Sequence, residues 1–222
     1  MNNLKEYLQN NQKNPSKELR LGSATVYVKE ELLPTIDLNK ILDFVTKTLP
    51  SQFLENIEMV YIGNFPFLKV KEVDAIFENG AIYISNKVEN EHELISDLIH
   101  EIAHSFEEIR PEELYSDGLI EEEFLAKRER LFMTLKTRGY QVDRTDFLNI
   151  EYDRKFDNFL YNEVGYEQLG GMTNGLFISP YAATSLREYF ANAFEEFFVN
   201  DMNTVKKNSP TVFQKIINYL EF

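Results

Sequence analysis

An Asn-Gly pair at positions 79 and 80 is the sequence feature that most constrains the fold. The runs VDAIF (73–77) and AIYIS (81–85) flank this pair. Asn-Gly between two such runs is the strongest short-range signal for a β-hairpin, because both residues readily adopt positive φ angles. The second run leads directly into the segment that carries all three histidines. We therefore expect a hairpin followed by a histidine-bearing helix.

The other β signals also fall in the first half of the chain. SATVYVK (23–29) and IEMVYIG (57–63) are rich in β-branched and aromatic residues and predict strands. Between them, apolar residues recur at helical spacing over 38–49, and Pro50 ends the pattern. Residues 1–22 contain a polar run around Pro15 and predict a flexible N-terminal arm.

The second half of the chain has helical patterns. We expect helices over 119–138, 145–163, 184–200 and 204–220. Residues 165–180 contain four of the nine glycines and predict a loop, either a mobile lid or a plain connection. Strands in the first half and helices in the second predict an α+β fold, with 23–222 as a single domain.

Composition excludes several classes of partner. The formal net charge of −14 would repel a nucleic-acid backbone or an anionic membrane. There is no apolar run of about 20 residues that could span a bilayer and no signal-peptide pattern at the start, so we expect a cytoplasmic protein, with export by another route left open. The chain has no cysteine, so a metal site would need histidine and carboxylate ligands.

Most of the negative charge is concentrated in one segment. Residues 89–123 contain 13 acidic residues and one basic residue, a net charge of −12. If this segment surrounds a cleft, it should attract peptides that carry Lys or Arg. The alternative is a solvated surface that keeps the protein soluble. All three histidines, His92, His100 and His104, lie within the segment.

Residues 100–104 read His-Glu-Ile-Ala-His, which is an H-E-x-x-H motif. On a helix, side chains four residues apart lie about 40° apart, so two imidazoles can bind one zinc ion. Glu101 can then act as a general base toward water activated by zinc. The apolar residues of 94–106 occupy one half of the helical wheel, and the two histidines occupy the other half. This arrangement disfavours packing of the histidines in the core. The alternative to a metal site is that both histidines are simply exposed.

Three nearby residues receive weaker assignments. Asp97 could accept a hydrogen bond from a ligand imidazole or be a solvated carboxylate. His92 lies near the expected helix start and should be exposed. Glu108 lies eight residues from His100, about 12 Å along a helix, and cannot complete the same site.

A third ligand should come from a second helix, because catalytic zinc sites usually have three protein ligands. In SLREYFANAFEEFFVN (185–200), Glu188, Asn192 and Glu195 lie opposite a broad apolar face. Geometry alone does not separate Glu188 from Glu195 as the ligand.

These motifs resemble a known group of zinc metallopeptidases. HEIAH after strand AIYIS, with Tyr181 seven residues before Glu188 and the continuation EYFANAFEEFF, is similar to the catalytic domain of anthrax toxin lethal factor and to the proline-proline endopeptidases. The resemblance covers about 81–108 and 179–220. It implies a zincin-like fold, His100, His104 and Glu188 as zinc ligands, and Tyr181 as a hydrogen-bond donor to the oxyanion or leaving group. Asn192 departs from the family, which often has Glu there.

The sequence therefore predicts a zinc-dependent endopeptidase that hydrolyses polypeptides, with Glu101 and Tyr181 as catalytic residues. Strand AIYIS would lie along the cleft and could pair with the substrate. The alternative for this strand is an ordinary internal strand that binds no substrate. Two other classes compete with this interpretation. One is a binding module with structural zinc, which would not need Glu101. The other is an interaction protein of phage or mobile-element type, which would hold no metal.

Overall fold

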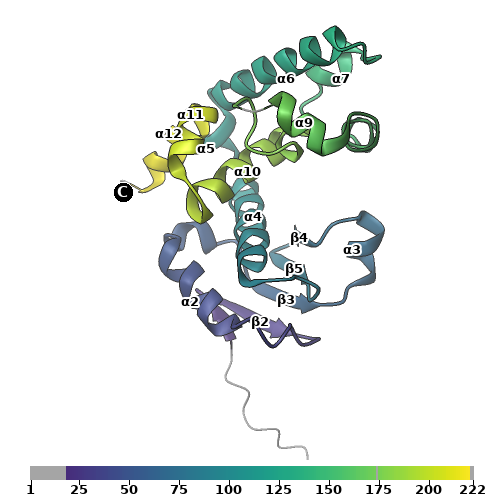
Figure 1. Ribbon diagram of the computed structural model, residues 1–222. Coiled ribbons are helices and arrows are strands. Elements are labelled where there is room, and N and C mark those ends of the chain that lie inside the picture. Colours follow the sequence, from purple (N-terminus) through teal and green to yellow (C-terminus); the bar gives the residue numbers. More distant parts are fainter. Residues whose placement is uncertain (1–18, 174, 221–222) are drawn as a thin grey trace, which may run out of the picture.

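The computed structural model describes residues 19–173 and 175–220 (Figure 1). Its first half contains a five-stranded mixed sheet of order β1-β2-β3-β5-β4. The central strands β2, β3 and β5 are parallel, while β1 and β4 pair antiparallel at the two edges. The bounds are β1 (Leu19–Leu21), β2 (Ala24–Val28), β3 (Met59–Gly63), β4 (Ala75–Glu78) and β5 (Ala81–Ser85).

The predicted hairpin is confirmed. Glu78 of β4 pairs with Ala81 of β5, so Asn79 and Gly80 form a two-residue turn. Their φ angles are 53° and 77°, as a turn with two left-handed residues requires. This turn places β4 at the edge of the sheet and β5 inside it.

The sheet is covered on one face by α2 (Leu38–Thr48) and α4 (Glu91–Ile109), with η1 (Ser51–Leu54) and α3 (Pro66–Lys71) in the connections (Figure 1). The helix predicted over 38–49 is confirmed, and the Asp37 side chain caps it by accepting from Lys40 N. Asn90 caps α4 in the same way. The buried face of α4 packs on the sheet through Leu94, Leu98 and Ile102, which forms the core of this half.

The second half of the chain is mainly helical, which confirms the α+β class. Helix α10 packs against α4 and joins the helical half to the sheet (Figure 1). The elements of this half are α5 (Pro111–Tyr115), α6 (Leu119–Thr137), α7 (Arg144–Leu148), α8 (Arg154–Asn158), η2 (Phe159–Gly165), α9 (Tyr166–Thr173), η3 (Tyr181–Ala183), α10 (Leu186–Val199), α11 (Met202–Asn208) and α12 (Pro210–Leu220).

The single helix predicted over 145–163 is wrong, because the chain breaks after Leu148. The carbonyl of Ile150 accepts from Leu186 N at the start of α10 instead of continuing a helix. Asp153 then caps a new helix through Lys155 N and Phe156 N. Residues 159–165 continue with the wider π-helical winding, which is rare and often occurs near functional sites.

The loop predicted over 165–180 is also partly wrong, since residues 166–173 form α9. Leu169 is fully buried, and Thr173 Oγ1 donates to its carbonyl. Burial of this apolar side chain offsets the helix-disfavouring effect of Gly170 and Gly171, which lie inside α9. A packed helix does not support a mobile lid here.

Two smaller differences concern the ends of the chain. The helix predicted over 204–220 is split at Ser209, because Pro210 cannot continue α11 and begins α12. The arm predicted over 1–22 ends in ordered structure, since Leu19–Leu21 forms β1 and Leu21 is buried. Residues 1–18 of the arm lie outside the described residues.

Candidate metal centre

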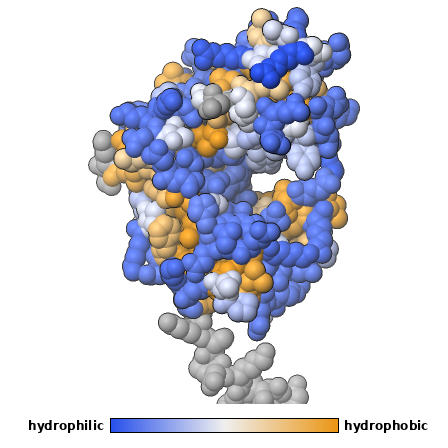
Figure 2. Space-filling view, in the orientation of Figure 1, coloured by the Kyte–Doolittle hydropathy of each residue, from blue (hydrophilic) through white to orange (hydrophobic). Residues whose placement is uncertain are grey.

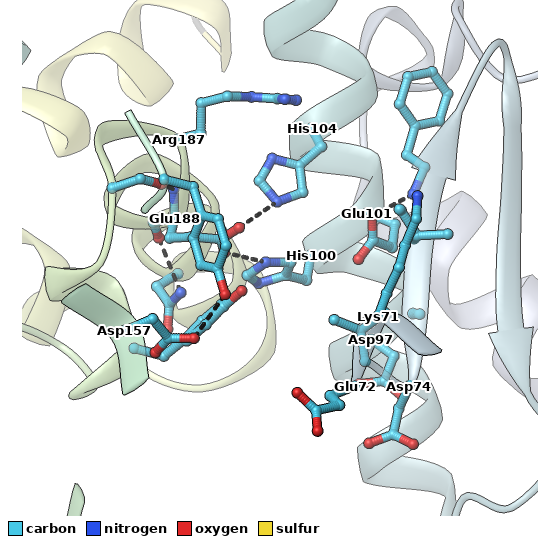
Figure 3. A pocket seen from close by; sticks show the side chains of 18 of the residues that line it. Lys71, Glu72, Asp74, Asp97, His100, Glu101, His104, Asp157, Arg187 and Glu188 are labelled. Atoms are coloured by element: carbon cyan, nitrogen blue, oxygen red, sulfur yellow. Dashed lines mark hydrogen bonds and ion pairs between the residues drawn. The ribbon is translucent and has the colours of Figure 1, made fainter. Parts of the chain in front are cut away.

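A cleft of about 960 Å³ lies between the sheet and the helical half. Figure 2 shows it as an opening between the two halves of the molecule, and Figure 3 shows its interior. One wall is the segment from Val70 to Phe77, which includes the edge strand β4. The opposite wall is contributed by residues between Glu151 and Asn158 and by Tyr181. Helices α4 and α10 supply the histidines and Glu188 between these walls.

The structure brings His100, His104 and Glu188 together as a group that could hold one metal ion, and their donor atoms all lie within 4.8 Å of one another. His100 Nε2 is 3.0 Å from Glu188 Oε2, and His104 Nε2 is 3.5 Å from Glu188 Oε1 (Figure 3). The same ring nitrogen of each histidine therefore faces the carboxylate. Ser185 caps α10 by accepting from Glu188 N, which places Glu188 in the first turn of the helix, facing α4.

The pKa values show how strongly these three groups interact. Burial alone would lower the pKa of His100, but hydrogen bonds to Glu188 and Glu195 outweigh it and raise that pKa to about 10. The pKa of His104 rises to about 9 against the effect of burial, through Glu107 and Glu188. Burial would raise the pKa of Glu188, but the two histidines hold it well below its usual range. A cation is thus strongly favoured between these side chains, which fits a metal ion.

A second carboxylate stands behind each histidine. His100 Nδ1 is 3.2 Å from Glu195 Oε2. His104 Nδ1 lies 3.5 Å from Glu107 Oε2, at ion-pair distance but without a hydrogen bond. Glu107 is itself buried and accepts from Tyr115 OH and Arg187 Nε. Carboxylates in these positions hold ligand imidazoles in one orientation and increase their basicity.

Of the two candidates for the third ligand, Glu188 belongs to the group with His100 and His104. Glu195 instead contacts the other ring nitrogen of His100. Neither expectation for Asp97 describes what is observed. It makes no hydrogen bond to a histidine, and its Oδ2 is buried without a partner rather than solvated. Burial, followed by the charges of Glu93 and Asp74, raises the pKa of Asp97 to about 7.

Glu101 is held by the edge of the sheet. Its Oε2 accepts a hydrogen bond of 2.6 Å from the backbone N–H of Phe77 in β4. Burial raises the pKa of Glu101, against the opposing charges of His104 and His100. A raised pKa makes a carboxylate a better proton acceptor near neutral pH. Glu101 therefore lies beside the metal group, turned toward β4 (Figure 3).

The strand along the cleft is β4, so the expectation that AIYIS borders it is wrong. AIYIS is β5, and its two edges are paired with β3 and β4. Asp74, which immediately precedes β4, accepts with its carbonyl from Ser85 N of the neighbouring strand. Backbone groups alternate in direction along a strand, so those of Ala75 and Phe77 turn away from β5 toward the cleft. The sequence does not indicate which of these two strands lies at the edge of the sheet, because either strand of the hairpin could pair with β3.

Tyr181 lines the cleft at the start of η3, and its hydroxyl makes no hydrogen bond to another described residue. Burial and the charge of Glu188 raise its pKa, so the hydroxyl keeps its proton. Two further tyrosines near this wall were not predicted. Tyr152 OH and Tyr166 OH both donate to Asp157, at 2.7 and 2.6 Å. No periodicity or motif in 149–166 marks this cluster, because the three residues belong to separate local structures.

Polar contacts also cross and support the cleft. Arg154 Nη2 lies 2.7 Å from Glu72 Oε2, which joins the two walls at an exposed position. Asn192, where the resembling family often has Glu, donates to Glu188 O and accepts from Ser179 Oγ. Asn192 therefore connects α10 to the segment before Tyr181, and its side chain forms no hydrogen bond to His100 or His104 among the described residues.

Some of these partners had sequence signals. Glu107 follows His104 by three residues, and Glu195 follows Glu188 by seven, so each shares a helix face with a group member. Ser185 and Glu188 form the Ser-x-x-Glu pattern that marks a helix start. His92 is exposed as predicted and lies 3.1 Å from Asn200 Oδ1.

Comparison with known proteins gives no match. No family model, no curated protein and no solved structure matches the chain significantly. Among the described residues, no helix is long and apolar enough to cross a membrane. The candidate site therefore rests on its own geometry.

Proposed function

We propose that the protein is a zinc-dependent endopeptidase. The observation that supports this most directly is the group of His100, His104 and Glu188 at the cleft, with Glu101 beside it and bonded to the edge strand. Two imidazoles and one carboxylate are the ligand set of several catalytic zinc sites. Zinc bound there would lower the pKa of a coordinated water and polarise a carbonyl. The resemblance of the two motifs to the zinc metallopeptidases favours the same function.

The residues around the group fit peptide hydrolysis. Glu101 would take a proton from the attacking water and pass it to the leaving nitrogen. Tyr181, whose raised pKa keeps it protonated, would donate a hydrogen bond to the developing oxyanion. An extended substrate would pair with the outward backbone groups of Ala75 and with the carbonyl of Phe77 in β4, since the N–H of Phe77 is bonded to Glu101. These roles assign binding to the edge strand and proton transfer to α4.

Acidic side chains in the cleft favour substrates with Lys or Arg. The cleft is lined by Glu72, Asp74, Asp97, Glu151 and Asp157 beside the metal group, against Lys71, Arg154 and Arg187. Of the acidic segment 89–123, only Asp97 and Glu101 contribute acids to this lining, so the attraction does not depend on the whole segment. Raising salt from about 20 to about 500 mM should slow cleavage of basic peptides selectively, because added ions screen exposed charges. Equal slowing of basic and neutral peptides would contradict the preference.

The direct test is a substitution of the proposed base. Glu101→Gln should lower kcat by about 10²- to 10⁴-fold, because the amide cannot accept the proton. The variant should still bind one zinc ion, which metal analysis can measure. Both proteins are incubated with a complex peptide library, with and without chelator, and the new termini are sequenced.

Glu108→Gln is the matched control, since it makes the same change on an exposed part of α4. It should cleave as the wild type does. Cleavage that survives in Glu101→Gln would refute the assigned base. Zinc binding without cleavage by the wild type would favour a binding module, and absence of zinc from the purified wild type would favour an interaction protein without metal.

A further inference from the structure

Arg128 is a buried charge with an unusual environment. It lies on α6, in a stripe with Phe124, Leu131 and Leu135, and is only 1% exposed. Burying a guanidinium is costly unless its donors are satisfied. Within the described part of the chain, no carboxylate lies at ion-pair distance from Arg128. The charge of Asp146 favours the guanidinium from beyond that distance, and the rest of the compensation comes from other groups.

Backbone carbonyls and aromatic rings supply much of this compensation, while Arg128 Nε is buried without a hydrogen-bond partner among the described residues. Arg128 Nη1 donates to Ala183 O at 2.9 Å and to Thr184 O at 3.2 Å, and Nη2 donates to Asp146 O. Its guanidinium carbon lies 4.2 Å from the ring centroid of Phe156, with Phe124 and Phe147 farther away. Burial lowers the pKa of Arg128 to about 10, which leaves it positively charged at neutral pH.

The carbonyls that Arg128 binds belong to the turn that carries Tyr181. η3 comprises Tyr181–Ala183. The carbonyls at the end of such a short helix have no hydrogen-bond partner within the helix. A cation at this end is favourable because the carbonyl dipoles converge there. The next residue, Ser185, caps α10. One side chain therefore joins α6 and α7 to the turn between Tyr181 and the helix of Glu188.

We propose that Arg128 is a positioning residue that holds the Tyr181 turn in place at the cleft. The catalytic role of Tyr181 in this inference rests on the proposed function. The effect of Arg128 on the position of the turn does not depend on that function. The planar fork of Arg can bind carbonyls of two segments at once, whereas a Lys ammonium is a point donor on a flexible stem. Arg128 contacts no substrate and acts through Tyr181 alone.

The first test compares variants on α6. Arg128→Met and Arg128→Lys should lower kcat by about 10- to 100-fold with KM nearly unchanged, as expected for a misplaced catalytic group. Zinc content should stay at one ion per chain. Leu131→Ala, which removes packing from the same stripe but no bond to the turn, should keep kcat. Loss of zinc in the Arg128 variants, or an equal loss of kcat in Leu131→Ala, would overturn the proposal.

The second test is a double-mutant cycle with Tyr181→Phe. If Arg128 acts through the Tyr181 hydroxyl, Arg128→Lys should lower kcat by less than about twofold in the Tyr181→Phe background. A general structural role would lower kcat by the same factor in both backgrounds. Additive effects would therefore contradict the proposal.

A third measurement does not depend on activity. Hydrogen exchange of a peptide covering 180–188, followed by mass spectrometry, reports opening of the turn. Exchange should be about tenfold faster or more in Arg128→Met and unchanged in Leu131→Ala, if the bonds of Arg128 close the turn. Unchanged exchange in Arg128→Met would refute the positioning role even in an active enzyme. If the wild type cleaves no peptide, the proposed function fails while this measurement still decides the inference.

Discussion

At the scale of single residues, the candidate site is a cluster of charges that compensate one another. The pKa of His100 is raised by Glu188 and Glu195, and the pKa of His104 is raised by Glu107 and Glu188, in each case against the effect of burial. Without metal, protons supply the positive charge. A metal ion would have to displace these protons, because only the neutral imidazole can be a ligand.

We therefore predict that metal binding is coupled to proton release. With histidine pKa values of about 10 and 9 in the metal-free protein, both rings carry a proton at pH 7. Zinc binding should release about two protons, and affinity should rise by about 100-fold per pH unit around neutrality. Calorimetry in two buffers of different ionisation enthalpy measures the number released. The control His92→Gln should leave the number of released protons unchanged. If zinc binding released no protons, the metal would bind elsewhere.

At the scale of secondary structure, the hairpin β4–β5 sets the position of Glu101. The turn at Asn79 and Gly80 makes β4 the edge strand, and the N–H of Phe77 then reaches Glu101. Gly80 has a φ of 77°, while its missing Cβ would meet other atoms at 3.6 Å or more. The backbone angle, and not lack of space, is what requires glycine there.

Two glycine substitutions should consequently have opposite effects. Gly80→Ala should destabilise the protein by about 1 kcal/mol, because the Cβ of alanine clashes with the backbone at a left-handed φ. Gly171→Ala is the matched change inside α9, where nothing lies within 4 Å of the added Cβ and φ is not positive. It should stabilise the protein by about 0.5 to 1 kcal/mol. Urea unfolding of both variants measures the difference, and a stabilising Gly80→Ala would contradict the assigned turn.

The elements that sequence predicted well have strong local signals. The hairpin turn, the helix over 38–49 and the histidine helix each follow from spacing, capping or turn chemistry within a few residues. The errors occurred where distant contacts decide. The break after Leu148 depends on a bond between Ile150 and Leu186, and α9 depends on burial of Leu169. The choice of β4 over β5 as the edge depends on how the hairpin joins β3.

The site was predictable to a similar extent. His100, Glu101 and His104 share one helix, so geometry within that helix brings them together. Glu188 required the packing of α10 against α4, which no local pattern specifies. Arg128 interrupts an apolar stripe at 120, 124, 131 and 135, a signal visible in the sequence, but its targets at Ala183 and Thr184 are not.

At the scale of the whole molecule, two halves enclose the cleft and an exposed ion pair joins its walls. Glu72 and Arg154 have side chains that are 69% and 64% exposed. Exposed pairs of this kind contribute only about 0 to 1 kcal/mol to stability. The pair is therefore weak as a stabilising contact, yet it connects the two walls of the cleft.

Breaking this pair should change access more than stability. We expect Arg154→Gln to leave the thermal midpoint nearly unchanged and to raise kcat/KM for a long polypeptide relative to a short peptide. Arg144→Gln is the control, because it removes a similar exposed pair with Glu129 that does not cross the cleft. Equal effects of both variants on the two substrates would contradict a gating role of the pair.

The recessed position of β4 has a consequence for the behaviour of the protein at high concentration. A free strand edge is normally a risk, because edges of neighbouring molecules can pair and aggregate. Here the outward groups of Ala75 and Phe77 lie inside a cleft, opposite the wall of Tyr152 and Tyr181. One extended chain can reach this edge, but the edge of a second folded sheet cannot. The protein should therefore keep an open strand edge without forming fibrils, which prolonged light scattering of concentrated samples would check.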